Sequence, residues 1–228
     1  MIAAEEASVS RGSKEEGIYK DGQEFERGEW MSETHEAKFG TRFTARNAAW
    51  FKWDDKWTVR KLKELYSQGP PRSDLDVIQF GVYTGVGPKC ICEKLAQAGV
   101  RFGRFVGFDS FTGLPPEADK ITPEQMEGDH WNEGAFSAAD ALETYDRDRL
   151  LERITATIAY PDTVLVPGMF SESLTDELAA TMRPAMFVDV DCDLYISARQ
   201  CLEWMAKHRL WFPGTVVRYD DWKGTPGA

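Results

Sequence analysis

The fold is decided by the stretch Val77-Ile78-Gln79-Phe80-Gly81-Val82-Tyr83-Thr84-Gly85-Val86-Gly87, which reads as a buried strand running into a glycine turn. Glycines allow the backbone to turn sharply and leave room for a ligand, and a helix expected from about Pro88 would direct its free N–H groups there. No Gly-Lys-Ser/Thr follows, so this is not a Walker loop. The spacing G-x3-G-x-G also differs from the dinucleotide pattern G-x-G-x-x-G.

Strands and helices alternate along the chain after this point. Apolar strands are expected at 76–80, 105–109, 163–166, 185–190 and 214–219, and helices at 59–66, 88–98, 138–158, 172–182 and 196–208. This alternation predicts an α/β, Rossmann-like fold with a mostly parallel sheet and helices on both faces. The polar, Pro- and Gly-rich segment 110–135 is expected to be an excursion that carries part of a site.

Composition narrows the class of partner. The chain has 228 residues and a formal net charge of -11, which argues against non-specific binding to nucleic acid or to anionic membranes. A small-molecule substrate or a cation fits this charge better. No apolar run approaches the roughly 20 residues that span a bilayer. The first 29 residues lack the apolar core of a signal peptide, so a cytoplasmic location is expected.

Two parts are expected along the chain: an N-terminal extension with an aromatic segment at 1–70 and a ligand-binding core at 71–228. Residues 1 to about 28 are charged with few apolar anchors and are expected to be mobile. Between Trp30 and Trp57, aromatic residues are interspersed with charge. This segment either packs on the core or closes over a ligand as a lid, and dimerisation through it is left open.

Polar residues follow the carboxyl ends of the expected strands, where ligands of open α/β sheets bind. Asp109 ends the second strand, some twenty residues beyond the glycine turn, and suits the two hydroxyls of a ribose. The alternative is that Asp109 caps a loop or a helix.

A second group of acids follows the fourth and fifth strands. If these strands are neighbours, Asp191, Asp220 and Asp221 converge, and close carboxylates repel one another unless a cation lies between them. Oxygen ligands of this kind suit Mg²⁺. The alternative is that each aspartate, including Asp189 and Asp193 nearby, caps a turn or helix independently.

Histidines and cysteines are few. His35 or His130 could act as a general base, although each alone is more often structural. The four cysteines lack the C-x2-C pairs of a zinc site and are expected to be reduced, partly buried thiols.

Two motifs are specific enough to indicate a family: Phe108-Asp109-Ser110-Phe111-Thr112-Gly113-Leu114-Pro115 and Asp191-Cys192-Asp193-Leu194-Tyr195. With them, residues 76 to about 223 resemble class I S-adenosylmethionine-dependent methyltransferases, in particular the macrocin O-methyltransferase-like family that modifies sugars of natural products.

The resemblance implies methyl transfer from S-adenosylmethionine to a hydroxyl of a small molecule (a sugar, a polyol or a phenolic natural product), usually with Mg²⁺. It implies metal ligands at Asp191, Asp220 and Asp221, and Asp191 and His130 are the candidate catalytic residues. The cofactor-binding positions carried over are Gln79, Gly81, Tyr83, Thr84, Gly85, Gly87, Asp109, Ser110, Met169, Phe170 and Cys192.

Two departures from the family pattern leave alternatives open. The family usually has an acid where this chain has Gln79, so charge pairing to the amino group of the cofactor is lost. The class normally continues with a helix and two more strands, so this chain either lacks C-terminal strands or completes its sheet differently. The other functions considered are a catalytically inactive binding protein with this fold and a nucleotide-dependent Rossmann oxidoreductase.

Overall fold

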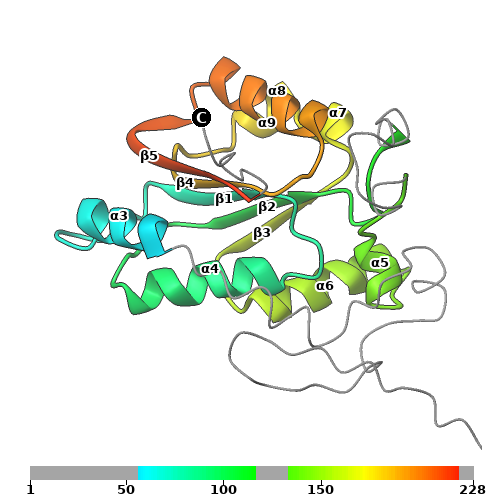
Figure 1. The fold of residues 1–228 in the computed structure, drawn as a ribbon, viewed down its shortest axis with the longest axis horizontal. Coiled ribbons are helices and arrows are strands. Elements are labelled where there is room, and N and C mark those ends of the chain that lie inside the picture. The colour runs from blue at the N-terminus through cyan, green and yellow to red at the C-terminus, as the bar shows by residue number, and fades with distance from the viewer. Residues whose placement is uncertain (1–55, 117–132, 221–228) are drawn as a thin grey trace, which may run out of the picture.

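The computed structural model describes residues 56–116 and 133–220, and in this part a five-stranded parallel sheet forms the centre of the molecule (Figure 1). The strand order is β3-β2-β1-β4-β5. All four neighbouring pairs are parallel. The strands are β1 Asp76–Phe80, β2 Phe105–Asp109, β3 Thr163–Pro167, β4 Ala185–Val190 and β5 Trp211–Tyr219. The predicted α/β fold with a parallel sheet is therefore confirmed.

Helices cover both faces of the sheet. Figure 1 shows α4 and α6 along one face and α8 and α9 along the other. Each face has its own apolar core, one built with α3, α4 and α6 and the other with α8 and α9. The helices are α3 Lys56–Tyr66, α4 Val86–Gln97, α5 Ala138–Ala141, α6 Arg147–Ile158, α7 Phe170–Ser173, α8 Asp176–Ala179 and α9 Tyr195–Lys207.

Two of the predicted helices are broken in the structure. The helix expected at 138–158 is α5 and α6, because Glu143 takes a left-handed φ of 46° and the Asp146 side chain accepts the Arg149 N–H as the N-cap of α6. The helix expected at 172–182 is α7 and α8, with Thr175 capping α8. Hydroxyl and carboxylate side chains that can satisfy backbone N–H groups start new helices inside an otherwise continuous apolar pattern.

The order of the strands creates a switch point at the carboxyl ends of β1 and β4. From β1 the chain moves outward to β2 and β3, then crosses back to place β4 on the other side of β1. Loops leaving β1 and β4 therefore diverge, and a crevice opens between them. The Asp191 N–H donates to the Phe80 carbonyl at 2.8 Å, which holds the two strand ends together beneath this crevice.

Several predictions concern residues outside the described ranges, namely the aromatic segment before Lys56, His35, His130 and Asp221. Within the predicted N-terminal extension, α3 is described, and its Leu62 and Tyr66 are buried in the same core as β1. In the described ranges, no helix has the length and apolar character needed to cross a membrane. All four cysteines are free thiols, as predicted, and Cys92, Cys192 and Cys201 are buried.

Candidate functional site

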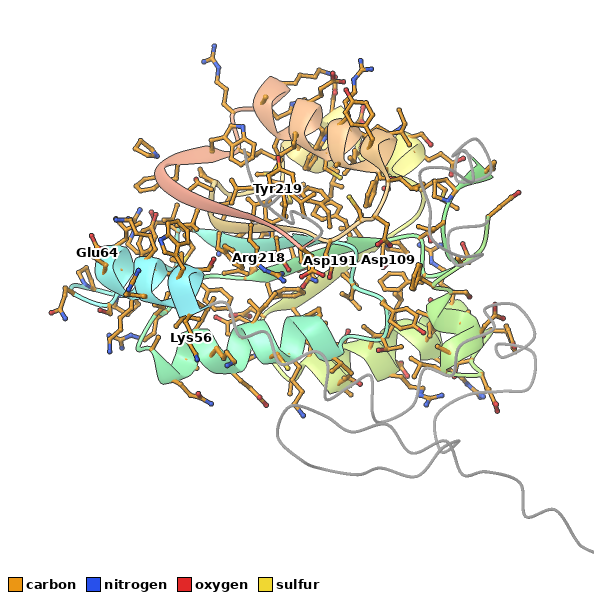
Figure 2. All side chains as sticks on the ribbon, viewed as in Figure 1. Lys56, Glu64, Asp109, Asp191, Arg218 and Tyr219 are labelled. Carbon is orange, nitrogen blue, oxygen red and sulfur yellow. The ribbon has the colours of Figure 1, made fainter. Side chains whose placement is uncertain are left out.

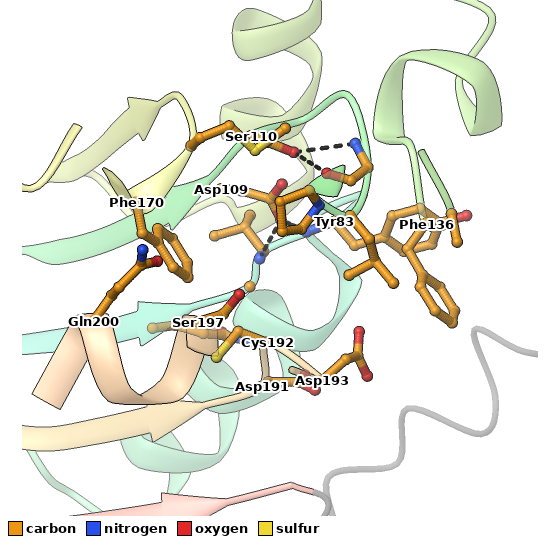
Figure 3. A pocket seen from close by; sticks show the side chains of 18 of the residues that line it. Tyr83, Asp109, Ser110, Phe136, Phe170, Asp191, Cys192, Asp193, Ser197 and Gln200 are labelled. Carbon is orange, nitrogen blue, oxygen red and sulfur yellow. Dashed lines mark hydrogen bonds between the residues drawn. The ribbon is translucent and has the colours of Figure 1, made fainter. Parts of the chain in front are cut away.

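A pocket of about 260 Å³ lies at the carboxyl end of the sheet and is lined by the segments that follow β1, β2, β3 and β4 (Figure 3). It brings together most of the residues that the sequence assigned to a site: Gln79, Gly81, Tyr83, Thr84, Gly87, Asp109, Ser110, Met169, Phe170, Asp191, Cys192 and Asp220. Gly85 is not part of the lining. His130 and Asp221 are outside the described residues.

Two glycines of the turn are required by contacts within the protein. A Cβ on Gly81 would overlap the carbonyl oxygen of Asp191, and one on Gly85 would lie 3.1 Å from the Ile154 side chain and backbone oxygen of α6. Their φ angles are 89° and 86°, a region that residues with side chains rarely adopt. The absence of a side chain at these two positions therefore lets the turn pack closely against the end of β4 and against α6. From the sequence, these glycines were expected only to form a sharp turn and to leave room for a ligand.

Asp109 holds the same turn from the end of β2. Its Oδ2 accepts the N–H groups of Val82 at 2.7 Å and Tyr83 at 2.8 Å, and its Oδ1 accepts the N–H of Phe111 at 2.6 Å. Burial raises the pKa of Asp109, and these backbone hydrogen bonds oppose that rise. Each carboxylate oxygen can accept about two hydrogen bonds, so Oδ1 keeps capacity for a ligand hydroxyl in the pocket.

Replacing Asp109 by Asn should cost both stability and binding at the pocket. The amide keeps one acceptor oxygen and turns an N–H₂ group towards backbone donors, so we expect a loss of about 2–3 kcal/mol in the free energy of unfolding. Chemical denaturation followed by circular dichroism measures this loss. Asp146→Asn is the matched control, since asparagine caps a helix as well as aspartate, and it should change stability by less than about 0.5 kcal/mol. Equal losses in the two variants would contradict the role given to Asp109.

The described lining of the pocket is acidic. It contains the carboxylates of Asp109, Asp191, Asp193 and Asp220, and within the part of the chain that is described no Lys, Arg or His belongs to it. Burial raises the pKa of Tyr83, with the charges of Asp109 and Asp140 adding to the effect, so its phenol stays protonated. The pocket as described therefore favours a ligand that carries positive charge.

The predicted metal ligands are partly placed by the structure. Asp191 and Asp220 share the pocket, but the guanidinium of Arg218 pairs with Asp220 and also donates to the buried Asp189 at 2.6 Å. Figure 2 labels Arg218 and Asp191 among the side chains of the molecule. In residues 56–116 and 133–220, no group of three or more His, Cys, Asp or Glu side chains is arranged to hold a metal ion. The described residues thus give the predicted magnesium site no support, and a cation that the sequence reading overlooked, Arg218, lies among these acids.

Gln79 is the most unusual polar residue of the pocket. It is 1% exposed in the middle of the sheet, and its side-chain oxygen Oε1 is buried without a hydrogen-bond partner among the described residues. In register, Gln79 lies beside Gly107 of β2 and Asp189 of β4. A buried acceptor without a donor is costly, so a natural interpretation is that a ligand supplies the donor.

Other lining residues were not assigned to the site from the sequence. One wall of the pocket is apolar and is formed by Leu114, Ala135, Phe136 and Ile196. These residues pack with Leu194 in a small hydrophobic cluster. Ser197 and Gln200 reach the pocket from the first turns of α9. Leu114 belongs to the quoted Gly-Leu-Pro motif and could have been named, whereas the positions on α9 follow only from the way that helix packs against the sheet.

Comparison with known proteins supports the fold. No protein-family model matches the chain, and no curated protein sequence matches it. Among solved structures, CalS11, a calicheamicin methyltransferase, aligns with a TM-score of 0.52 and 21% identity over 79% of this chain and 66% of that one. The O-methyltransferase NovP aligns with a TM-score of 0.43 and 17% identity over 67% of this chain and 59% of that one.

The alignment with CalS11 shows the class of fold. The described chain has the Rossmann-like α/β fold found in O-methyltransferases, with its pocket where that fold binds ligands. The chain spans slightly less than two thirds of CalS11 and less of NovP.

Proposed function

We propose that this protein transfers a methyl group from S-adenosylmethionine to a hydroxyl of a small molecule, such as a sugar, a polyol or a phenol. In this reaction the carbon–sulfur bond of the sulfonium breaks and an oxygen–carbon bond forms. The hydroxyl proton leaves to a base, and S-adenosylhomocysteine is released. The bound sulfonium supplies an electrophilic methyl group, so the protein mainly has to position the partners and accept a proton.

The charge of the pocket is the observation that carries the proposal. S-Adenosylmethionine brings a sulfonium and an ammonium group, which the carboxylates of the described lining would attract, even though Asp220 among them is already paired with Arg218. NAD and nucleotides bring phosphates, which the same carboxylates would repel. The charge therefore favours a methyltransferase over the Rossmann oxidoreductase considered from the sequence.

Residue roles follow from position in the pocket. Asp109 has acceptor capacity for a ribose hydroxyl, and Gln79 Oε1 can accept a hydrogen bond from the ammonium group. The adenine ring of the cofactor would lie against Met169, Phe170 and Cys192. Asp191, directly after strand β4, is the carboxylate that we assign to the acceptor hydroxyl, either directly or through a metal ion.

Magnesium belongs to the proposal through the sequence pattern alone. Mg²⁺ would lower the pKa of the acceptor hydroxyl, with Asp191, Asp220 and Asp221 as ligands. Because Arg218 pairs with Asp220, the metal would have to compete with that ion pair. Assays with added Mg²⁺ and with EDTA decide whether the metal takes part.

Two measurements on the purified protein test the proposal. Calorimetry should detect binding of S-adenosylhomocysteine and no binding of NAD. Transfer of labelled methyl from S-adenosylmethionine to a panel of hydroxylated sugars and phenols should then identify an acceptor. Binding without transfer to any acceptor would favour the inactive binding protein, and binding of NAD alone would overturn the proposal.

Replacing Gln79 by Leu separates binding from stability. If Gln79 Oε1 accepts a hydrogen bond from the ammonium group of the ligand, removing this oxygen should weaken S-adenosylhomocysteine binding by roughly 10- to 100-fold. This is the contribution of one hydrogen bond to a charged group. The free energy of unfolding without ligand should stay unchanged or rise, because an unpaired buried acceptor is removed. Gln97→Leu, at an exposed position of α4, is the control and should leave affinity unchanged. A variant of Gln79 that loses stability but keeps its affinity would show that the amide is structural.

A further inference from the structure

Arg218 lies beside an acid group at the ends of β4 and β5, which is made of Asp189, Asp191 and Asp220. Arg218 and Asp189 are register partners on these two strands, which are neighbours in the described sheet (Figure 1). The guanidinium Nη1 donates to Asp189 Oδ1 at 2.6 Å, and Nη2 pairs with Asp220. One guanidinium therefore serves two carboxylates, one inside the sheet and one in the lining of the pocket.

The backbone of β5 fixes this arrangement. The Asp220 N–H donates to the Val190 carbonyl at 3.1 Å, so the pairing of β5 with β4 continues one residue beyond Tyr219. Side chains alternate between the two faces of a strand, and residues 218 and 220 therefore lie on the same face. The strand itself brings Asp220 next to Arg218.

Asp189 keeps the guanidinium in place. Its residue is 1% exposed, and a buried carboxylate is stable as an anion only with a cation or strong hydrogen-bond donors beside it. The Arg218 side chain is itself only 17% exposed. Withdrawing Arg218 would deprive Asp189 of this charge partner, so the guanidinium stays beside Asp220.

A guanidinium held in this way changes which ligands the acid group can take. A divalent ion bound by Asp191 and Asp220 would lie next to the positive charge of Arg218, which would repel it. The ion would also have to displace an ion pair from Asp220. Both effects lower the affinity of the acid group for a metal ion.

We propose that Arg218 is the cation of the acid group and takes the place that a divalent metal ion would hold. Arg218 offsets part of the acid charge, and the site is closed to Mg²⁺. One consequence rests on the function proposed above: methyl transfer proceeds without a metal. The acceptor hydroxyl then gives its proton directly to the Asp191 carboxylate, while its oxygen forms the bond to the methyl group and the carbon–sulfur bond breaks.

Binding of Mn²⁺, a paramagnetic substitute for Mg²⁺, tests this assignment in the full chain. Electron paramagnetic resonance measures free Mn²⁺ while the protein is titrated. The decisive variant combines Asp189→Asn with Arg218→Met, which removes both charges of the buried pair and leaves no unpaired charge in its place. Arg218→Lys keeps a cation at this position. Arg199→Met is the control, because it removes an exposed arginine that pairs with Glu203 on α9.

The wild type, Arg218→Lys and Arg199→Met should bind Mn²⁺ only weakly. The double variant should bind one Mn²⁺ at least about tenfold more tightly, because the repulsion by the guanidinium is gone and Asp220 is released. Adding Asp220→Asn should reverse this gain, which locates the ion at the acid group. A double variant with the affinity of the wild type would overturn the proposal, and so would a tight Mn²⁺ site in the wild type that Asp191→Asn removes.

Methyl transfer separates this proposal from the function itself. After treatment with EDTA, the wild-type protein should keep its full rate of transfer from S-adenosylmethionine. A rate that is lost in EDTA and restored by Mg²⁺ would show that the function stands and that Arg218 does not replace the metal. If no acceptor is methylated with or without Mg²⁺, the proposed function fails, and the Mn²⁺ titration still decides the role of Arg218.

Discussion

Replacing Gly81 by Ala is expected to abolish folding of the core. The added Cβ would overlap the carbonyl oxygen of Asp191 and lie 2.7 Å from its carbonyl carbon. Neither strand end can easily retreat, because Gly81 N–H donates to Phe108 at 2.9 Å and Asp191 N–H donates to Phe80 at 2.8 Å. The φ of 89° adds backbone strain of about 1–2 kcal/mol for any L-residue with a side chain.

The sum of overlap and strain should exceed about 4 kcal/mol, a large part of the 5–15 kcal/mol that stabilises a typical domain. In chemical denaturation, the midpoint of unfolding should move to a much lower denaturant concentration, or the variant should be recovered only as aggregate. Gly99→Ala is the matched control: it has a similar φ of 75° but nothing within 4 Å of an added Cβ, so it should lose only about 1–2 kcal/mol. Similar losses at Gly81 and Gly99 would show that the approach of β1 to β4 is not close.

Much of this site was predictable from the sequence, because the pattern of strands and helices fixes the arrangement of the sheet. Apolar runs of five or six residues separated by helical segments allow one arrangement, a parallel sheet whose carboxyl ends share an edge. Once this is accepted, the residues after each run must gather at that edge. Asp109, Phe170 and Asp191 were placed in one pocket by this reasoning alone, and they line it in the structure.

The remaining features depend on side-chain geometry that periodicity does not contain. The guanidinium of Arg218 is shared by Asp189 and Asp220, which requires the register of β5 against β4. Whether Gln79 Oε1 has a hydrogen-bond partner depends on how the neighbouring strands pack. The position of Ser197 in the pocket lining depends on how α9 packs against the sheet. The break between α5 and α6 depends on whether a polar side chain caps a helix or faces solvent, and the apolar spacing is the same in both cases.

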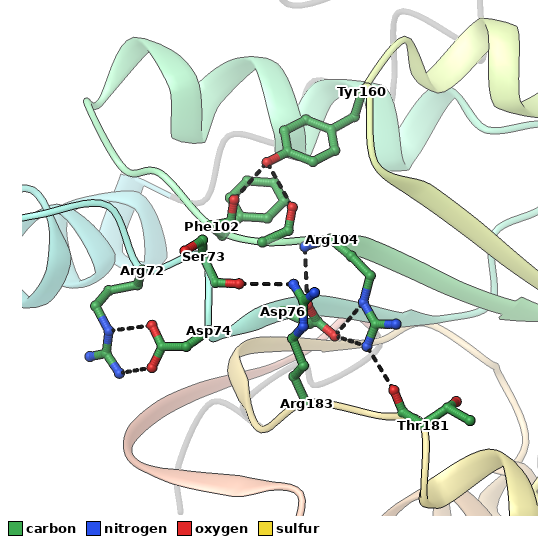
Figure 4. Close-up of polar contacts among 10 residues, drawn as sticks. Arg72, Ser73, Asp74, Asp76, Phe102, Arg104, Tyr160, Thr181 and Arg183 are labelled. Atoms are coloured by element: carbon green, nitrogen blue, oxygen red, sulfur yellow. Dashed lines mark hydrogen bonds and ion pairs between the residues drawn. The ribbon is translucent and has the colours of Figure 1, made fainter.

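A buried ion pair holds the opposite, amino-terminal end of the sheet. Asp76 opens β1 and is fully buried, and Figure 4 shows it next to Arg104 and Arg183. Arg104 donates to it from Nη2 at 2.6 Å, from Nε at 3.1 Å and from the backbone N–H at 3.0 Å. The Arg183 guanidinium lies 3.8 Å away and donates to the Ser73 carbonyl at 2.8 Å. The pair therefore fixes β1 against β2 at the end away from the pocket.

Arg104→Met should cost about 3–5 kcal/mol of unfolding free energy, because the buried carboxylate of Asp76 loses two of its three hydrogen bonds and its closest cation. Arg199→Met, which breaks an exposed pair with Glu203, is the control and should cost less than about 1 kcal/mol. In Arg104→Met only Arg183, at 3.8 Å, is left to balance the Asp76 charge. Adding Asp76→Asn removes that charge and keeps an acceptor for the backbone N–H of residue 104, so it should restore at least half of the loss. The double-mutant cycle from denaturation midpoints measures this coupling. If the second substitution lowers stability further, the cost of Arg104→Met comes from lost packing of the arginine side chain, and burial of the Asp76 charge is not its cause.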